Sequence, residues 1–348
     1  MRTATLPLHY GSAPKWLMDR MIKLGRAICE AVVIYYGRDE LLRRLSDPFW
    51  FQSLGCILGF DWHSSGVTTT VCGAIKFGLA PLMDELGVYV CGGKGKRSLK
   101  TPEEILFFSE KNGFDGDFFV RISRLSAKVD SICLQDGFEL YHHTFIFTKD
   151  GKWAVIQQGM CPEMKIARRY HWFSEDIKSM VEEPHSAVCC DIKRKVLNLV
   201  HRDSRRLRER TINLTMAVTS QGLSLVMPKE HEIKDKKITL KKIEETLRKV
   251  VENNPQTFEE LILIKGLGKE SMRALVLLAE LIFGEKPSFE DPVRFSFAHG
   301  GKDGHPYPVK RELYDKTIYF MEDLLRKAKI NPVEKDKAFK SLKLFLSS

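Results

Sequence analysis

The chain has 348 residues and a hydrophobic content of 43 %, so it is long enough for two globular domains with sizeable cores. Its 55 Lys and Arg against 45 Asp and Glu give a net charge of +10, which favours polyanionic partners, nucleic acid first among them. No stretch reaches the roughly 18 consecutive apolar residues of a membrane span, and residues 1–16 lack the apolar run of a signal peptide, so we expect a cytoplasmic protein without membrane contact.

The eight cysteines are spread along the chain, and no two of them form a Cys-x-x-Cys pair. That spacing gives little support to a thiolate zinc site or to an iron–sulfur cluster. We expect the cysteines to act as small buried hydrophobic residues, and we expect the protein to use neither a cofactor nor a metal.

The first hundred residues alternate helical and extended patterns. Apolar residues recur at helical spacing over 16–36, and a serine at 64 or 65 can cap a helix that runs to about residue 79. A short strand is expected at 88–90. It leads into CGGKGKR at 91–97, a basic glycine segment that could hold phosphate through backbone N–H groups or could be an ordinary flexible loop.

Residues 118–135 carry an apolar stripe and a polar stripe with the same helical period. The polar stripe contains Arg121, Arg124 and Lys128, which predicts a helix with three cations on one face. Two alternating segments follow, at 138–148 and 152–159, and the turn Lys149-Asp150-Gly151 between them is a strong β-hairpin signal.

These patterns predict an α+β fold with two domains. Residues 1–180 should form a mixed domain with the β-hairpin and a short sheet. Residues 181–348 should form a mainly helical domain, and its 186–250 segment has 16 Lys and Arg against 8 Asp and Glu. The segment 291–309 is rich in Gly and Pro and contains two histidines, which favours a functional loop over a connector.

The segment 256–284 indicates two helices joined by a glycine hairpin, and the run Ile-Lys-Gly-Leu-Gly-Lys resembles the helix-hairpin-helix motif of DNA-repair proteins. Glycines allow a positive φ and a close backbone approach, and the second helix directs unpaired N–H groups at a phosphate. An ordinary αα-hairpin with a glycine turn is the alternative. The expected DNA contacts are with the backbone and carry little sequence preference. The predicted DNA-binding residues are Arg121, Arg124, Lys265, Gly266, Gly268, Lys269 and Arg273.

Several longer phrases resemble the archaeal and bacterial family catalogued as domain of unknown function 763. These phrases are LPLHYG (6–11), DPFWFQSLGCILGFDWHSSGVTTTVCGA (47–74), SAKVDS (126–131), LYHHTF (140–145), ARRYHW (167–172) and FAHGGKDGHPYPV (297–309). The resemblance spans most of the chain. It implies a DNA-repair role with abasic-site lyase activity, and it carries no assignment of catalytic residues.

An abasic-site lyase needs an amine that attacks C1′ of the sugar and a base that takes the C2′ proton. A lysine serves as that amine where burial or neighbouring cations lower its pKa. Lys128 has Arg124 at i−4 and Arg121 one turn further back, so we predict that it is the nucleophile. A phosphate-contacting or salt-bridged lysine is the alternative. The predicted catalytic residues are Lys128, Asp130, His142 and, as second choice of nucleophile, Lys302.

Two other functions remain open. A metal-dependent nuclease could draw its ligands from several Asp, Glu and His residues, although none of them forms a recognised ligand spacing. A non-catalytic DNA-binding protein would use the hairpin and the basic helices alone, and would leave the 291–309 segment unexplained. The ligands open to a nuclease are Asp61, His63, Asp136, Glu139, His142, His299, Asp303 and His305.

Overall fold

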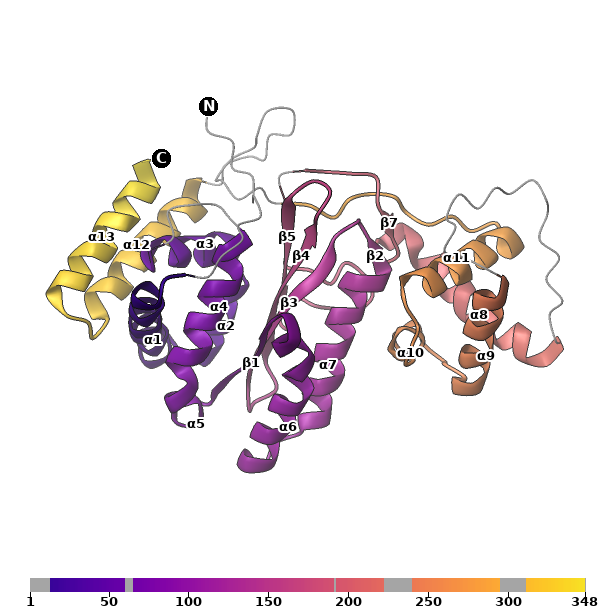
Figure 1. Cartoon of the computed structure of the whole chain (residues 1–348), viewed down its shortest axis with the longest axis horizontal. Coiled ribbons are helices and arrows are strands. Elements are labelled where there is room, and N and C mark those ends of the chain that lie inside the picture. Colours follow the sequence, from indigo (N-terminus) through magenta and orange to yellow (C-terminus); the bar gives the residue numbers. More distant parts are fainter. Residues whose placement is uncertain (1–12, 60–64, 191, 222–239, 295–310, 348) are drawn as a thin grey trace.

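The computed structural model describes residues 13–59, 65–190, 192–221, 240–294 and 311–347. It confirms the predicted α+β fold. A five-stranded antiparallel sheet lies at the centre with helices on both faces, and a separate group of helices packs beside it (Figure 1).

Helices from the N-terminal part of the chain cover one face of the sheet. The expected helix over 16–36 is confirmed, and the helix expected after Ser64 begins at Ser65. The third helix starts where Asp47 accepts hydrogen bonds from the N–H groups of Phe49 (2.8 Å) and Trp50 (2.9 Å), with proline at its first position. These helices are α1 (Lys15–Tyr36), α2 (Arg38–Ser46), α3 (Pro48–Ile57) and α4 (Ser65–Leu79), with the short η1 (Ala80–Leu82) and α5 (Met83–Leu86) after them.

The strands follow the spatial order β1-β3-β4-β5-β6, and every neighbouring pair is antiparallel. The predicted β-hairpin is confirmed as β3 and β4, and Gly151 has a φ of 92° in its turn. The segment expected to be a glycine loop at 91–97 is strand as far as Lys94. The strands are β1 (Val88–Lys94), β3 (Glu139–Thr148), β4 (Trp153–Cys161), β5 (Ile166–Phe173) and β6 (Ala187–Cys189).

Both faces of this sheet are buried, since α2 and α4 cover one face and α6 (Thr101–Asn112) and α7 (Gly116–Lys128) cover the other. All eight residues of β5 are consequently buried, although they include two arginines. Arg168 is neutralised there by Asp136 at 2.9 Å and by Asp291 at 2.8 Å. The basic and aromatic run at 167–172 is therefore core structure and offers no surface for a ligand.

A second group of helices contains α8 (Arg205–Gln221), α9 (Leu240–Asn253), α10 (Phe258–Leu263) and α11 (Lys269–Phe283). The basic residues that directly precede α8 in the sequence are not part of this helix. Instead Leu197–Asn198 form the short strand β7, which pairs with β2 (Leu134–Gln135) and so holds the chain extended. A 3₁₀ turn, η4 (Arg202–Ser204), then leads into α8.

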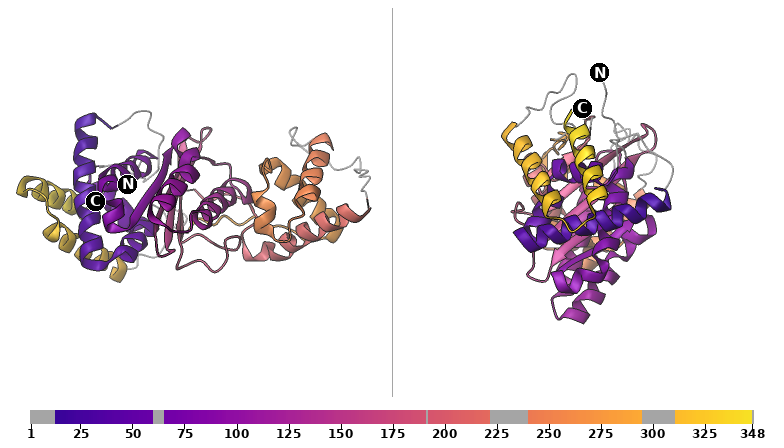
Figure 2. Two further views of the ribbon diagram at one scale, coloured as in Figure 1. Left: turned by 90° about the horizontal axis from the view of Figure 1, so that it is seen from below. Right: turned by 90° about the vertical axis from the view of Figure 1, so that its left-hand side faces the viewer.

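The last two helices pack at the far end of the molecule from α8–α11, as Figure 2 shows. The helix α12 (Arg311–Lys327) contacts α1, and α13 (Pro332–Ser347) contacts α3. Arg44 of α2 also lies over the ring of Phe320 at 3.6 Å. From the sequence we expected these helices in the basic C-terminal domain. In the structure they pack against the N-terminal helices and complete their core.

Two further expectations concern burial. The eight cysteines are all unbonded and buried, as predicted. One helical segment, Ser65–Leu86, is long and apolar enough to cross a membrane by length and composition, and half of its residues in the most apolar window are buried inside the protein. A core helix of a soluble protein has the same properties, and this one packs against α1 and β1.

Candidate active-site cleft

A cleft of about 630 Å³ opens between the sheet body and the α10–α11 hairpin. One wall comes from α7 and the first half of β3, and the facing wall comes from residues 263–266 in the hairpin. The turn η2 (Gly95–Lys100) and the start of α6 form a third side. The cleft thus joins segments that lie more than a hundred residues apart in the sequence.

Lys128 lies on the wall of this cleft, in the last turn of α7. Its Nζ donates a hydrogen bond of 2.8 Å to the backbone carbonyl of Leu267 in the hairpin turn. The side chain is about half buried, and this burial lowers the pKa of Lys128 from its ordinary 10.5. The predicted direction is therefore found, but its cause is burial and not the two neighbouring arginines.

The polar residues of α7, together with Gln135 of β2, face the hairpin, and several of them hold the hairpin in place. Arg121 forms an ion pair with Glu259 of α10 at 3.3 Å. Gln135 donates to the carbonyl of Lys269 at 2.9 Å and accepts a hydrogen bond from Arg273 at 2.9 Å. These contacts fix the distance between the two walls of the cleft.

Five of the seven predicted DNA-binding residues line one of two cavities, and Arg121 and Gly268 line neither. Arg124, Lys265 and Gly266 line the cleft with Lys128. Lys269 and Arg273 line a second, smaller cavity of about 170 Å³, and Lys269 also pairs with Glu139 at 3.4 Å.

The two glycines of the hairpin have different backbones. Gly266 has a φ of 82°, which favours glycine, and a Cβ there would lie 2.8 Å from the Nζ of Lys249. Gly268 has a φ of −110°, and a Cβ there would meet nothing closer than an oxygen of Glu270 at 3.8 Å. A positive φ at both glycines was expected, and only Gly266 has one.

Asp130 does not line the cleft, although it follows Lys128 by two residues. After Lys128 the helix widens into a π-helical turn, η3 (Val129–Cys133), which directs the carboxyl of Asp130 into the core. There it accepts hydrogen bonds from Gln157 at 2.6 Å and Trp172 at 3.0 Å, and it also contacts His185. This arrangement argues against Asp130 as the group that removes a proton from a substrate.

His142 and His143 point to opposite faces of the sheet, as expected for neighbours in a strand. The Nε2 of His142 contacts the hydroxyl of Thr144, two residues on, at 2.9 Å, whereas the Nε2 of His143 contacts Ser123 of α7 at 2.8 Å. Both residues contribute to the wall of the cleft, but the imidazole that faces α7 belongs to His143. The sequence pattern had selected His142.

Burial keeps both histidines neutral. It lowers the pKa of His142 to about 3, and it also lowers the pKa of His143 below its ordinary 6.5. The deep wall of the cleft is therefore uncharged at neutral pH, while its mouth is basic. Two exposed cations, Arg124 of α7 and Lys265 of the hairpin, line the cleft itself, and the adjoining η2 carries the exposed Lys96, Arg97 and Lys100.

The remaining predicted residues fall elsewhere. Lys302, with His299, Asp303 and His305, lies outside the described residues, and so do Asp61 and His63. Among the residues that the structure describes, no three His, Cys, Asp or Glu side chains come together in a way that could hold a metal ion.

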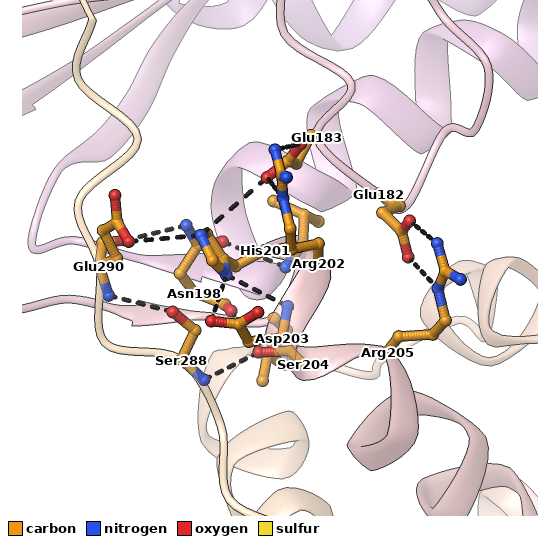
Figure 3. Close-up of polar contacts among 12 residues, drawn as sticks. Glu182, Glu183, Asn198, His201, Arg202, Asp203, Ser204, Arg205, Ser288 and Glu290 are labelled. Atoms are coloured by element: carbon orange, nitrogen blue, oxygen red, sulfur yellow. Dashed lines mark hydrogen bonds and ion pairs between the residues drawn. The ribbon is translucent and has the colours of Figure 1, made fainter.

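A second polar cluster, which the sequence patterns did not indicate, surrounds His201 at a cavity of about 410 Å³ (Figure 3). His201 lies 3.4 Å from Glu290 and 3.4 Å from Asp203. Ser204 beside them donates to the carbonyl of Asn198 at 2.7 Å and accepts from the N–H of Ser288 at 2.9 Å. The cluster thus ties the segment after α11 to β7 and η4.

The comparisons with known proteins add one finding. Residues 2–309 match the profile of a family described as "Protein of unknown function (DUF763)". Searches among curated proteins and among solved structures gave no match. The matched range contains every segment that forms the cleft and ends just before α12.

Proposed function

The chain belongs to the DUF763 family, and we propose that it is a DNA-repair enzyme that cleaves abasic sites by Schiff-base β-elimination. The observation that carries the proposal is Lys128, a lysine with a lowered pKa on the wall of a cleft with a basic mouth. Perturbed amines in clefts are typical of covalent catalysis. The substrate class is DNA that has lost a base, and no cofactor takes part.

The environment of Lys128 suits the first step of this reaction. A neutral amine can donate one N–H to the carbonyl of Leu267 and still direct its lone pair at C1′ of the open sugar. The nitrogen forms a bond to C1′, water leaves, and an iminium ion results. Loss of the C2′ proton then drives the 3′ phosphate from C3′, and hydrolysis of the iminium product releases the lysine.

The surface around the cleft suits a DNA backbone. Exposed Arg124 and Lys265 line its two facing walls, the adjoining η2 carries further exposed cations, and such cations attract phosphates whatever the base sequence. The hairpin adds a glycine turn and the N-terminus of α11, and we interpret it as a helix-hairpin-helix motif. Leu99 is 78 % exposed at the mouth, where an apolar side chain can enter the gap left by a missing base.

Borohydride trapping on a duplex with one abasic site tests the proposal. Borohydride reduces the iminium to a stable amine, so the wild-type protein should be trapped covalently, and EDTA should change neither trapping nor cleavage. A metal-dependent nuclease would lose cleavage in EDTA and would not be trapped. A non-catalytic DNA-binding protein would neither cleave the DNA nor be trapped on it. A wild-type protein that binds abasic DNA without any trapping would exclude the proposed reaction.

One observation favours a structural role for Lys128, because its bond to Leu267 joins α7 to the hairpin. Lys128→Arg separates the two roles. A guanidinium can still donate to the carbonyl of Leu267, but it stays protonated and cannot form an imine. We expect Lys128→Ala and Lys128→Arg both to fold and to bind DNA. If Lys128→Arg nevertheless shows neither cleavage nor trapping, the lysine acts as the nucleophile. Lys265→Ala is the matched control, since it removes an exposed lysine of the same cleft: it should weaken DNA binding and keep both cleavage and trapping at saturating DNA.

A further inference from the structure

A series of hydrogen bonds that the lysine chemistry does not use runs from the wall of the cleft, beside Lys128, into the core. It begins at Ser123 and passes through His143, Gln157 and Asp130 to His185. We infer that the pair Ser123–His143 takes the C2′ proton in the elimination step, and that Gln157 and Asp130 position it. The inference rests on the proposed lyase function and assigns the base that this reaction requires.

The distances along the chain fit a base held in one orientation. The Nε2 of His143 lies 2.8 Å from the hydroxyl of Ser123, and its Nδ1 lies 2.9 Å from the Oε1 of Gln157. Ser123, His143 and Gln157 all contribute to the wall of the cleft, as Lys128 does. A base within hydrogen-bond reach of a hydroxyl, oriented by a third group, is the arrangement that activates hydroxyls in enzymes.

The hydrogen bonds of Gln157 determine which nitrogen of His143 carries the proton. The amide nitrogen of Gln157 donates to the carboxylate of Asp130 at 2.6 Å and to the carbonyl of Ser126 at 3.2 Å. Both partners only accept, so the amide oxygen must face His143, and Nδ1 must be the protonated nitrogen. The Nε2 is then a bare acceptor directed at Ser123.

Asp130 holds this orientation from the core. Its carboxylate is fully buried and accepts from Gln157 and from the indole N–H of Trp172, with His185 on its other oxygen. Every partner lies in a packed helix or strand or in the segment next to β6, and such surroundings keep a base within a few tenths of an ångström of its working position. Asp130, which the sequence suggested as a base, is in this account a positioning residue.

The proton passes from the sugar through Ser123 to His143. Once the imine joins Lys128 to C1′, the hydroxyl oxygen of Ser123 takes the C2′ proton and passes its own proton to Nε2 of His143. The electron pair of the C2′–H bond forms the C2′=C3′ double bond, and the pair of the C3′–O bond leaves with the 3′ phosphate. His143 then returns its proton to solvent or to the departing phosphate. The lowered pKa of His143 keeps it neutral beforehand and makes this return rapid.

The test separates imine formation from elimination. Trapping and strand cleavage are measured in parallel on a duplex with one abasic site, for the wild type, Ser123→Ala, His143→Gln and Asp130→Asn. His201→Gln is the matched control, because it removes a histidine outside the cleft. Ser123→Ala and His143→Gln should trap as the wild type does and should cleave about 10²-fold more slowly. Asp130→Asn should lower kcat and leave KM unchanged, whereas a merely structural loss would change the melting temperature and lower both steps together.

Three results would overturn the inference. Wild-type cleavage by folded Ser123→Ala or His143→Gln would show that the pair takes no proton. Loss of both trapping and cleavage in those variants would mean that the two residues are needed to form the imine and not for the elimination. Failure of the wild type itself to trap would reject the lyase reaction and the inference with it. If His143→Gln does not fold, Ser123→Ala decides alone, since it removes a single oxygen atom from a helix.

Discussion

The two walls of the cleft differ in charge and in exposure. The deep part of the wall formed by α7 and β3 is buried, and its histidines are held neutral by that burial. The facing wall and the mouth carry exposed cations, Lys265 among them, and a glycine turn. Under the proposed function, this difference separates the residues that carry out the chemistry from those that bind DNA. Lys128 joins the two walls, because its own helix belongs to one wall while its amine contacts the hairpin of the other.

The largest expected effect concerns this shared residue. Lys128→Arg should lower the rate of abasic-site cleavage by about 10³-fold or more, because the guanidinium cannot form an imine. The affinity for uncut abasic DNA should stay within a few fold. Gel-resolved cleavage and fluorescence anisotropy measure the two quantities on one duplex. Retained cleavage would move the nucleophile elsewhere, and Lys302 is the next lysine to change.

The basic mouth should make binding sensitive to salt. If the cations around it contact about four phosphates, affinity should fall about 150-fold between 50 mM and 200 mM salt. Unrelated duplex sequences should bind alike, because phosphate contacts carry no base information. Lys265→Ala should reduce the slope of log affinity against log salt by about one. A flat salt dependence would mean that the mouth does not bind the backbone.

The glycines of the hairpin should differ from each other. Gly266→Ala forces a side chain into a positive φ and should cost about 1–2 kcal/mol in stability or in DNA affinity, the latter corresponding to about 5–30-fold. Gly268→Ala has room for its Cβ and should leave the melting temperature unchanged, so any loss of affinity reports the closeness of the DNA alone. Equal stability of the two variants would show that the turn relaxes freely.

A last expected effect concerns the stability of the neutral wall at low pH. The pKa values of His142 and His143 are lowered on folding, so the unfolded chain takes up protons below pH 6.5 that the folded chain does not. Stability should therefore fall as pH drops from 7 to 5, by up to about 1.4 kcal/mol per pH unit for each histidine. Urea unfolding at each pH measures this loss. His143→Gln should reduce the pH dependence, and an unchanged dependence would place its origin elsewhere.

Local patterns determined the elements that build the cleft. The helical period over 16–36, the Asp150-Gly151 turn between β3 and β4, and the glycine turn before α11 each act over a few residues, and each is found where it was expected. The placement of Lys128 on a polar stripe was equally local, since residues four apart share one face of a helix. The α+β class followed from these elements.

The tertiary structure decided everything that depends on distant contacts. It buries Lys128 against Leu267, it turns Asp130 into the core through a π-helical turn, and it presents His143 to α7 in place of His142. No pattern along the chain reports which face of a strand a helix will cover. It also packs α12 and α13 against the N-terminal helices, where their apolar faces are buried. Periodicity in the sequence indicates which residues share one face of a helix or strand. Which residues that face contacts is decided only by the packing of the elements.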